Sequence, residues 1–134
     1  MATRYLLDTN IASYIIKSNI PAVRRRLLRI PMAQIAISAV TEGELRYGAA
    51  RRTGATQLQR IVEEFLLRVS ILPWDSDAAQ HYGHLRASLE GAGRPMGNLD
   101  LMIGAHALAL DAVLVSNDQS FTRIKKLKVE DWTI

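Results

Sequence analysis

The stretch Tyr5-Leu6-Leu7-Asp8-Thr9-Asn10 decides the fold, because an apolar run that ends abruptly in polar residues is typical of a buried strand. A strand that is apolar at consecutive positions indicates a parallel sheet with helices on both faces. Ligands of such sheets bind outside the carboxyl ends of the strands, where Asp8 would stand. The stretch therefore predicts a carboxylate delivered to a crevice, although an acid here also suits the cap of a helix predicted over residues 11–17.

The rest of the chain alternates apolar runs with amphipathic segments. Further strands are predicted over residues 34–38, 70–74, 112–116 and 128–132, and helices over residues 11–17, 22–30, 39–50, 57–69, 78–90 and 101–110. Pro73 has no N–H for a ladder, which places the third strand at a sheet edge, and the last short strand is a second edge candidate. Strands that alternate with helices predict an α/β protein with a helix-covered, mostly parallel sheet.

The composition predicts one domain, residues 1–134. A chain of 134 residues with 49% hydrophobic content can bury one compact core. The absence of cysteine excludes disulfides, thiolate metal sites and a cysteine nucleophile, which fits a reducing compartment. Arg4 and Asp8 interrupt the N-terminal apolar run, and His106 and Asp111 interrupt the stretch 101–115. We therefore expect neither a signal peptide nor a membrane span, and a cytoplasmic protein.

Positive charge is unevenly distributed along the chain. Seventeen Lys and Arg residues against 13 Asp and Glu residues give a net charge of +4 and a pI of about 9.8. The basic residues gather in three clusters, which are Arg24, Arg25, Arg26 and Arg29; Arg51 and Arg52; and Lys125, Lys126 and Lys128. Any one cluster is consistent with a solvated helix face. Beside an acidic centre, the clusters together favour binding of a phosphate backbone.

Four carboxylates, those of Asp8, Glu44, Asp100 and Asp118, stand at predicted junctions of strands and helices. Acids at such positions also cap helices, and Thr41 with Glu44 fits the spacing of a capping box. In a parallel sheet, however, carboxylates that follow neighbouring strands converge and repel one another. A hard divalent cation neutralises such a cluster, and all-oxygen ligation favours Mg²⁺ or Mn²⁺ over Zn²⁺.

Four motifs, in this order and spacing, carry a family resemblance. They read Leu-Leu-Asp8-Thr-Asn10, Ile-Ser38-x-Val-Thr-x-x-Glu44-Leu-x-x-Gly48, Asn-Leu-Asp100-Leu-x-Ile and Leu-Val-Ser-Asn117-Asp118-x-x-Phe121. From residue 4 to about residue 132, the chain resembles the PIN-domain ribonucleases, and within them the VapC toxins of bacterial toxin–antitoxin modules.

This resemblance implies a fold, a site and a reaction. The fold would be a three-layer α/β/α sandwich, and the protein a homodimer whose acidic groove is blocked by a cognate antitoxin. The acidic metal site would comprise Asp8, Glu44, Asp100 and Asp118, with Thr9, Asn10, Ser38, Ser116 and Asn117 as supporting polar groups. The activity would be Mg²⁺-dependent endonucleolytic cleavage of a structured RNA such as tRNA, leaving 5′-phosphate and 3′-hydroxyl ends.

Other polar and aromatic residues carry no such assignment. We expect His81, His84 and His106 to be satisfied or exposed rather than catalytic, and Trp74, Trp132, Tyr47 and Phe121 to pack in the core or an interface rather than stack on bases. No role is carried onto Glu42. Two alternatives from other classes are a receiver-like signalling module with an acidic Mg²⁺ pocket and a non-catalytic RNA-binding domain whose acids only cap helices.

Overall fold

Five short strands form one sheet in the computed structural model, which describes residues 2–134. They are β1 (Tyr5–Leu7), β2 (Ile35–Ser38), β3 (Ser70–Leu72), β4 (Val113–Val115) and β5 (Lys128–Glu130). The order across the sheet is β3-β2-β1-β4-β5, and every pairing is parallel. All five predicted strands are present, and β3 and β5 occupy the edges as expected.

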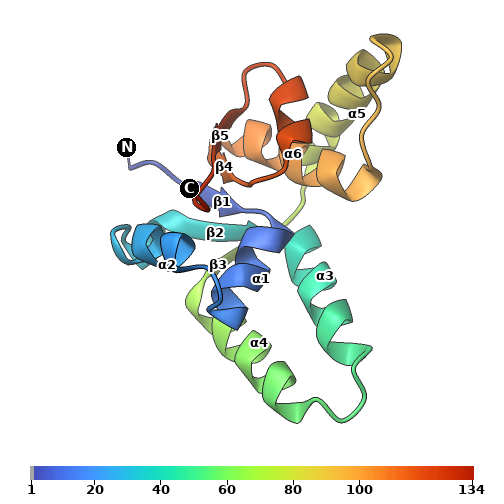
Figure 1. Cartoon of the computed structure of the whole chain (residues 1–134). Coiled ribbons are helices and arrows are strands. Elements are labelled where there is room, and N and C mark those ends of the chain that lie inside the picture. Colours follow the sequence, from blue (N-terminus) through green and yellow to red (C-terminus); the bar gives the residue numbers. More distant parts are fainter. Residues whose placement is uncertain (1) are drawn as a thin grey trace.

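Six α-helices cover the two faces of this sheet. They are α1 (Thr9–Lys17), α2 (Pro21–Leu28), α3 (Ala39–Ala50), α4 (Thr56–Arg68), α5 (Ser76–Gly91) and α6 (Asn98–Leu110), with short 3₁₀ turns η1 (Met32–Gln34) and η2 (Gln119–Arg123). Figure 1 shows α1 to α4 on one side of the strands and α5 with α6 on the other. The three-layer α/β/α architecture is therefore confirmed.

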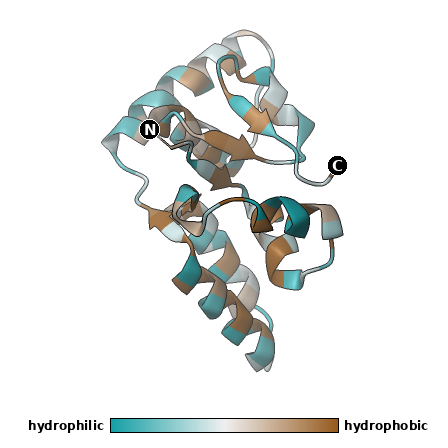
Figure 2. Ribbon diagram, turned by 90° about the vertical axis from the view of Figure 1, so that its left-hand side faces the viewer, coloured by the Kyte–Doolittle hydropathy of each residue, from teal (hydrophilic) through white to brown (hydrophobic). Residues whose placement is uncertain are grey.

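The strands are apolar on both faces because both faces are covered. Leu7 and Ile37 point into the core beneath α1 to α4, whereas Leu6 and Leu114 point into the core beneath α5 and α6. All four side chains are fully buried, and each such burial contributes roughly 1.5–3 kcal/mol. In Figure 2 the strands are mainly brown and lie between the helices.

The parallel register brings the carboxyl ends of three strands to one edge. Leu7 pairs with Ile37 of β2 on one side and with Val115 of β4 on the other. The residue that follows Leu7 is Asp8, and the residue that follows Val115 is Ser116. The sequence therefore places polar groups side by side at the carboxyl ends of the strands, where α1 and α3 begin.

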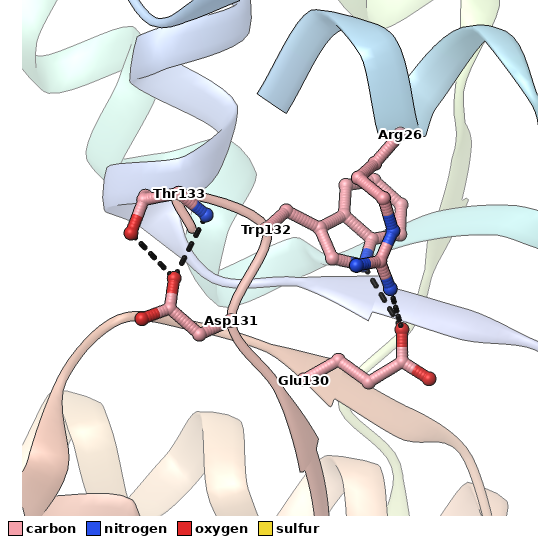
Figure 3. A network of polar contacts seen from close by, with 5 residues as sticks. All are labelled: Arg26, Glu130, Asp131, Trp132 and Thr133. Carbon is pink, nitrogen blue, oxygen red and sulfur yellow. Dashed lines mark hydrogen bonds and ion pairs between the residues drawn. The ribbon is translucent and has the colours of Figure 1, made fainter. Parts of the chain in front are cut away.

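The last residues of the chain lock α2 against the sheet (Figure 3). One carboxylate oxygen of Glu130 accepts hydrogen bonds from Arg26 at 2.9 Å and from the indole N–H of Trp132 at 3.0 Å. The Arg26 guanidinium lies 5.8 Å from the centroid of the Trp132 ring, which is fully buried and packs on Tyr5. The ion pair is partly exposed and adds little stability by itself, so the buried indole is the main anchor.

Among the helices of residues 2–134, none combines the length and the apolarity that crossing a membrane requires.

Candidate active site

Asp8 lies at the end of β1 and is almost completely buried. Its carboxylate accepts a hydrogen bond from the backbone N–H of Ile11 at 2.8 Å, and so it caps α1. Burial raises the pKa of Asp8 from 3.8 to about 6; hydrogen bonds from Ser116 and Ile11 act against this rise, and the charges of Asp100 and Asp118 add to it. Asp8 is therefore both a helix cap and one member of a group of acids.

Glu44 is held by α1 and not by a capping box. The N-cap of α3 is Ser38, whose hydroxyl accepts a hydrogen bond from the N–H of Val40 at 3.1 Å, while Thr41 is buried inside the first turn. The capping-box interpretation of Thr41 and Glu44 was therefore wrong. The carboxylate of Glu44 instead accepts a hydrogen bond from the Thr9 hydroxyl at 2.6 Å, and the Thr9 and Thr41 hydroxyl oxygens are 3.2 Å apart. Thr9 thus fixes Glu44 across two helices.

Asp100 and Asp118 complete the acidic group. Partial burial raises the pKa of Asp100, and the charges of Asp118 and Glu44 raise it further. The carboxylate of Asp118 caps η2 through the N–H of Ser120 at 2.9 Å. The backbone N–H of Asp118 donates to the Ser116 hydroxyl at 3.0 Å, and Ser116 also lowers the pKa of Asp8. Asp100 is therefore the acid that connects the group electrostatically, because its charge raises the pKa of Asp8 and its own pKa is raised by Asp118 and Glu44.

The remaining polar residues differ in their surroundings. Asn10 is exposed at the start of α1, and the side-chain amide of Asn117 donates to the hydroxyl of Tyr14 at 3.4 Å. The Ser38 hydroxyl lies 2.9 Å from Nδ1 of His106, and both side chains are buried. Burial lowers the pKa of His106, so its ring is neutral near pH 7. The sequence did not reveal the contact between Ser38 and His106. The one feature that could have indicated it is a single histidine in a helix rich in Ala and Leu.

The donor set fits a hard cation better than a transition metal. Across residues 2–134, no three acidic or histidine side chains are gathered in a ready-made metal-ligand arrangement. The groups at the site are carboxylates and hydroxyls, and Nδ1 of His106 is already hydrogen-bonded to the Ser38 hydroxyl. Mg²⁺ is usually held by one or two carboxylates and keeps several of its waters, so it does not require a closed protein cage.

The two arginine clusters lie in different surroundings. Arg51 and Arg52 line a cavity of about 240 Å³ together with Thr9 and Glu44, so this cluster adjoins the acids. On α2, Arg26 is bound to Glu130, whereas Arg24, Arg25 and Arg29 are exposed.

Glu42 lies on α3 two residues before Glu44, but its side chain belongs to a separate contact. Its carboxylate pairs with Arg46 at 3.0 Å, and Arg46 also reaches Glu63 on α4. His81 is exposed and contacts the backbone oxygen of Asp77 in its own helix. The structure thus gives these side chains partners away from the four acids.

Comparison with known proteins places this chain close to one family over nearly its full length. The family model described as the PIN domain matches residues 5–127. The tRNA(fMet)-specific endonuclease VapC of Shigella flexneri is 37% identical over 131 residues, which cover 97% of this chain and 98% of that protein. Ribonuclease VapC1 of Haemophilus influenzae is also 37% identical, over 96% of this chain and 98% of that protein.

Solved structures give the same result for the fold. A DNA-bound VapBC structure from Salmonella typhimurium matches with a TM-score of 0.90 and 35% identity, covering 98% of this chain and 99% of that one. VapBC2 from Rickettsia felis, bound to a DNA fragment from its promoter, matches with a TM-score of 0.87 and 36% identity, covering 96% of this chain and 98% of that one.

Proposed function

This chain belongs to the PIN-domain family and, within it, to the VapC endoribonucleases of toxin–antitoxin modules, and we propose that its four acids bind Mg²⁺ to hydrolyse a structured RNA. The observation that carries the proposal is that the charge of Asp118 raises the pKa of both Asp8 and Asp100, and that the charge of Glu44 also raises the pKa of Asp100. Mn²⁺ is a possible substitute because it accepts the same oxygen ligands. Family membership leaves the receiver-like and non-catalytic alternatives without support.

The ion and the contacts around the carboxylates have separate tasks in this proposal. When bound, the ion would offset the negative charges, lower the pKa of a water and stabilise the charge on the leaving oxygen. Asp8 is fixed by its cap to Ile11, and Glu44 is fixed by the Thr9 hydroxyl. The Ser116 hydroxyl accepts a hydrogen bond from the backbone N–H of Asp118, and Ser116 also lowers the pKa of Asp8. These contacts hold the carboxylates in place before a metal and a substrate phosphate arrive.

The class of substrate follows from the relatives and from the charge beside the site. The Shigella and Salmonella relatives are named tRNA(fMet)-specific endonucleases. We propose that this chain also cleaves a tRNA, acts as one domain over residues 1–134 and works as a homodimer. Products with 5′-phosphate and 3′-hydroxyl ends are expected.

The direct test uses purified, partner-free protein and total RNA, with Mg²⁺ or with EDTA. Metal-dependent appearance of fragments, followed by mapping of their ends, would support the proposal. RNA binding without cleavage at any Mg²⁺ concentration would contradict it.

We propose that a cognate antitoxin inhibits this site by inserting an Arg or Lys side chain. Relatives have been solved as VapBC complexes, and a group of repelling carboxylates favours a charge-assisted, bidentate guanidinium. In the same cleavage assay, removing that one basic side chain from the antitoxin should relieve inhibition. Full inhibition by an antitoxin that contacts only surfaces remote from the acids would refute this mechanism.

Arg52→Ala should weaken RNA binding, because Arg52 lies beside Glu44. Each lost phosphate contact removes about one unit from the slope of log K against log salt concentration. The affinities of the parent and the variant would be compared over a range of salt concentrations in EDTA. Arg25→Ala, tested alone, measures the contribution of the α2 cluster, which we expect to be smaller. Unchanged affinity and slope for Arg52→Ala would show that Arg51 and Arg52 form only a solvated face.

A further inference from the structure

The four aromatic residues considered from the sequence differ sharply in exposure. Trp132 and Phe121 are buried in the two cores, as expected. The indole N–H of Trp74 donates to the backbone oxygen of Met102 at 2.9 Å. Tyr47, by contrast, is 66% exposed on α3. Of these four residues, Tyr47 is the one whose ring is mostly available to another molecule.

Tyr47 lies next to the acidic site. It is three residues after Glu44, so both project from neighbouring positions on one face of α3. A groove of about 680 Å³ runs along this face, and its lining includes Gly43, Glu44, Tyr47, Gly48, Arg51 and Leu99. Leu99 directly precedes Asp100, so the groove extends from α3 to the start of α6. Its volume falls within the range of small-molecule sites.

Two glycines keep this groove open. A Cβ atom placed on Gly43 or Gly48 would meet no other atom within 4 Å, so both positions face open space. Gly48 also costs α3 roughly 1 kcal/mol relative to Ala, and no close packing accounts for it. The absence of these side chains leaves room for a flat group beside the Tyr47 ring.

Arg51 provides the second element of the groove. Its guanidinium lies 5.9 Å from the centroid of the Tyr47 ring, a cation–π distance, and Arg51 is exposed. Arg52 follows it and lines the adjoining cavity, which shares Glu44 and Arg51 with this groove. An exposed aromatic ring beside arginines is the combination that single-stranded nucleic acids use for base stacking and backbone neutralisation.

We propose that Tyr47 and Arg51 form a nucleobase-binding subsite, in which one base next to the cleaved phosphate stacks on Tyr47. The inference rests on the proposed ribonuclease function and goes beyond it, because it names residues that bind a base beside the cut. A second copy of this chain is a less suitable occupant. Glu is depleted at protein interfaces, whereas Glu44 lines this groove.

The test compares Tyr47→Ala, Tyr47→Phe and Tyr47→Trp with the parent, using total tRNA and a pool of RNA oligonucleotides of randomised sequence. Tyr47→Ala should raise KM by about 10-fold, the effect of losing one stacked base, and leave kcat within about twofold. It should also weaken the base preference next to the mapped cut. Tyr47→Phe and Tyr47→Trp should restore both properties. Leu67→Ala, which removes an exposed side chain from α4, is the matched control and should match the parent.

A binding measurement separates this inference from the proposed function. Two cleavage-deficient proteins are compared, the double variant Asp118→Asn with Tyr47→Trp and the single variant Asp118→Asn. RNA should quench the tryptophan fluorescence of the double variant and change that of the single variant little. Quenching supports the subsite even if the parent fails to cleave RNA, a failure that would overturn the proposed function only. Unchanged KM and base preference in Tyr47→Ala would overturn the subsite. The subsite would also be overturned if sedimentation showed that Tyr47→Ala converts a dimeric parent into a monomer, because the groove would then be an interface between two copies of the chain.

Discussion

Asp8→Asn should abolish metal-dependent RNA cleavage, with a loss of at least about 100-fold. Asn caps a helix about as well as Asp, so the bond to the Ile11 N–H is retained while the negative charge is lost. A metal-directed carboxylate contributes several kcal/mol to stabilising the transition state, and each 1.36 kcal/mol is a factor of about ten in rate. The measurement is cleavage of total RNA at saturating Mg²⁺, with the melting curve recorded in parallel to confirm folding.

The same substitution should stabilise the metal-free protein above about pH 6. The pKa of Asp8 in the folded protein, about 6, exceeds its ordinary value of 3.8, so the folded state binds more protons between these two values. The stability of the parent therefore falls as pH rises through this window, by up to about 3 kcal/mol. Asp8→Asn removes this loss, so its advantage should be present above about pH 6 and absent below about pH 4.

Urea unfolding in EDTA across this pH range measures the effect directly. Mg²⁺ should then raise the melting temperature of the parent and leave that of Asp8→Asn nearly unchanged. A site at 100 times its dissociation constant adds about 2.7 kcal/mol, and we expect less because Mg²⁺ sites of this kind retain much of their water. A variant that is less stable than the parent at every pH would show that the Asp8 carboxylate serves the fold alone.

Most of the fold could be predicted from the sequence, because the decisive signals are local. The apolar runs around Leu6 and Leu114 identify buried strands, and Pro73 marks an edge. Helix boundaries were less predictable. α6 begins at Asn98, three residues before the predicted start, so Asp100 lies within the first turn of the helix and does not precede it. Helix ends depend on caps and loop geometry, which apolar periodicity does not encode.

The contacts that orient the site could not be predicted, because they join distant parts of the chain. Thr9 and Glu44 are 35 residues apart, and Ser38 and His106 are 68 apart. The spacing of Thr41 and Glu44 satisfied a local capping motif equally well, yet Ser38 had already taken the cap position. Local patterns placed Asp8 and Asp118 correctly at element junctions, whereas Glu44 lies within α3 and Asp100 within the first turn of α6. These patterns could not say which side chain holds each acid.

The residue on which the metal-site and capping hypotheses differ most clearly is now Glu44, since the structure removes its capping role. Glu44→Gln retains an oxygen that can accept the 2.6 Å hydrogen bond from Thr9, and it deletes only the charge. We expect the metal-free variant to be as stable as the parent, or slightly more so. In the parent, the charge of Glu44 repels that of Asp100 and raises its pKa, and the variant lacks this repulsion. RNA cleavage at saturating Mg²⁺ should fall by about 100-fold, as for Asp8→Asn.

Glu42→Gln is the matched control for Glu44→Gln, because it makes the same chemical change on the same helix. Glu42 pairs with Arg46 at the surface, so its loss should leave cleavage intact. Reduced cleavage by Glu44→Gln alone would assign the effect to a charge at the acidic site and not to the net charge of α3. Full cleavage by Glu44→Gln, with an unchanged melting curve, would leave Asp8, Asp100 and Asp118 as the whole acidic site. Glu44 would then only anchor Thr9, and the metal would have to be held by three carboxylates.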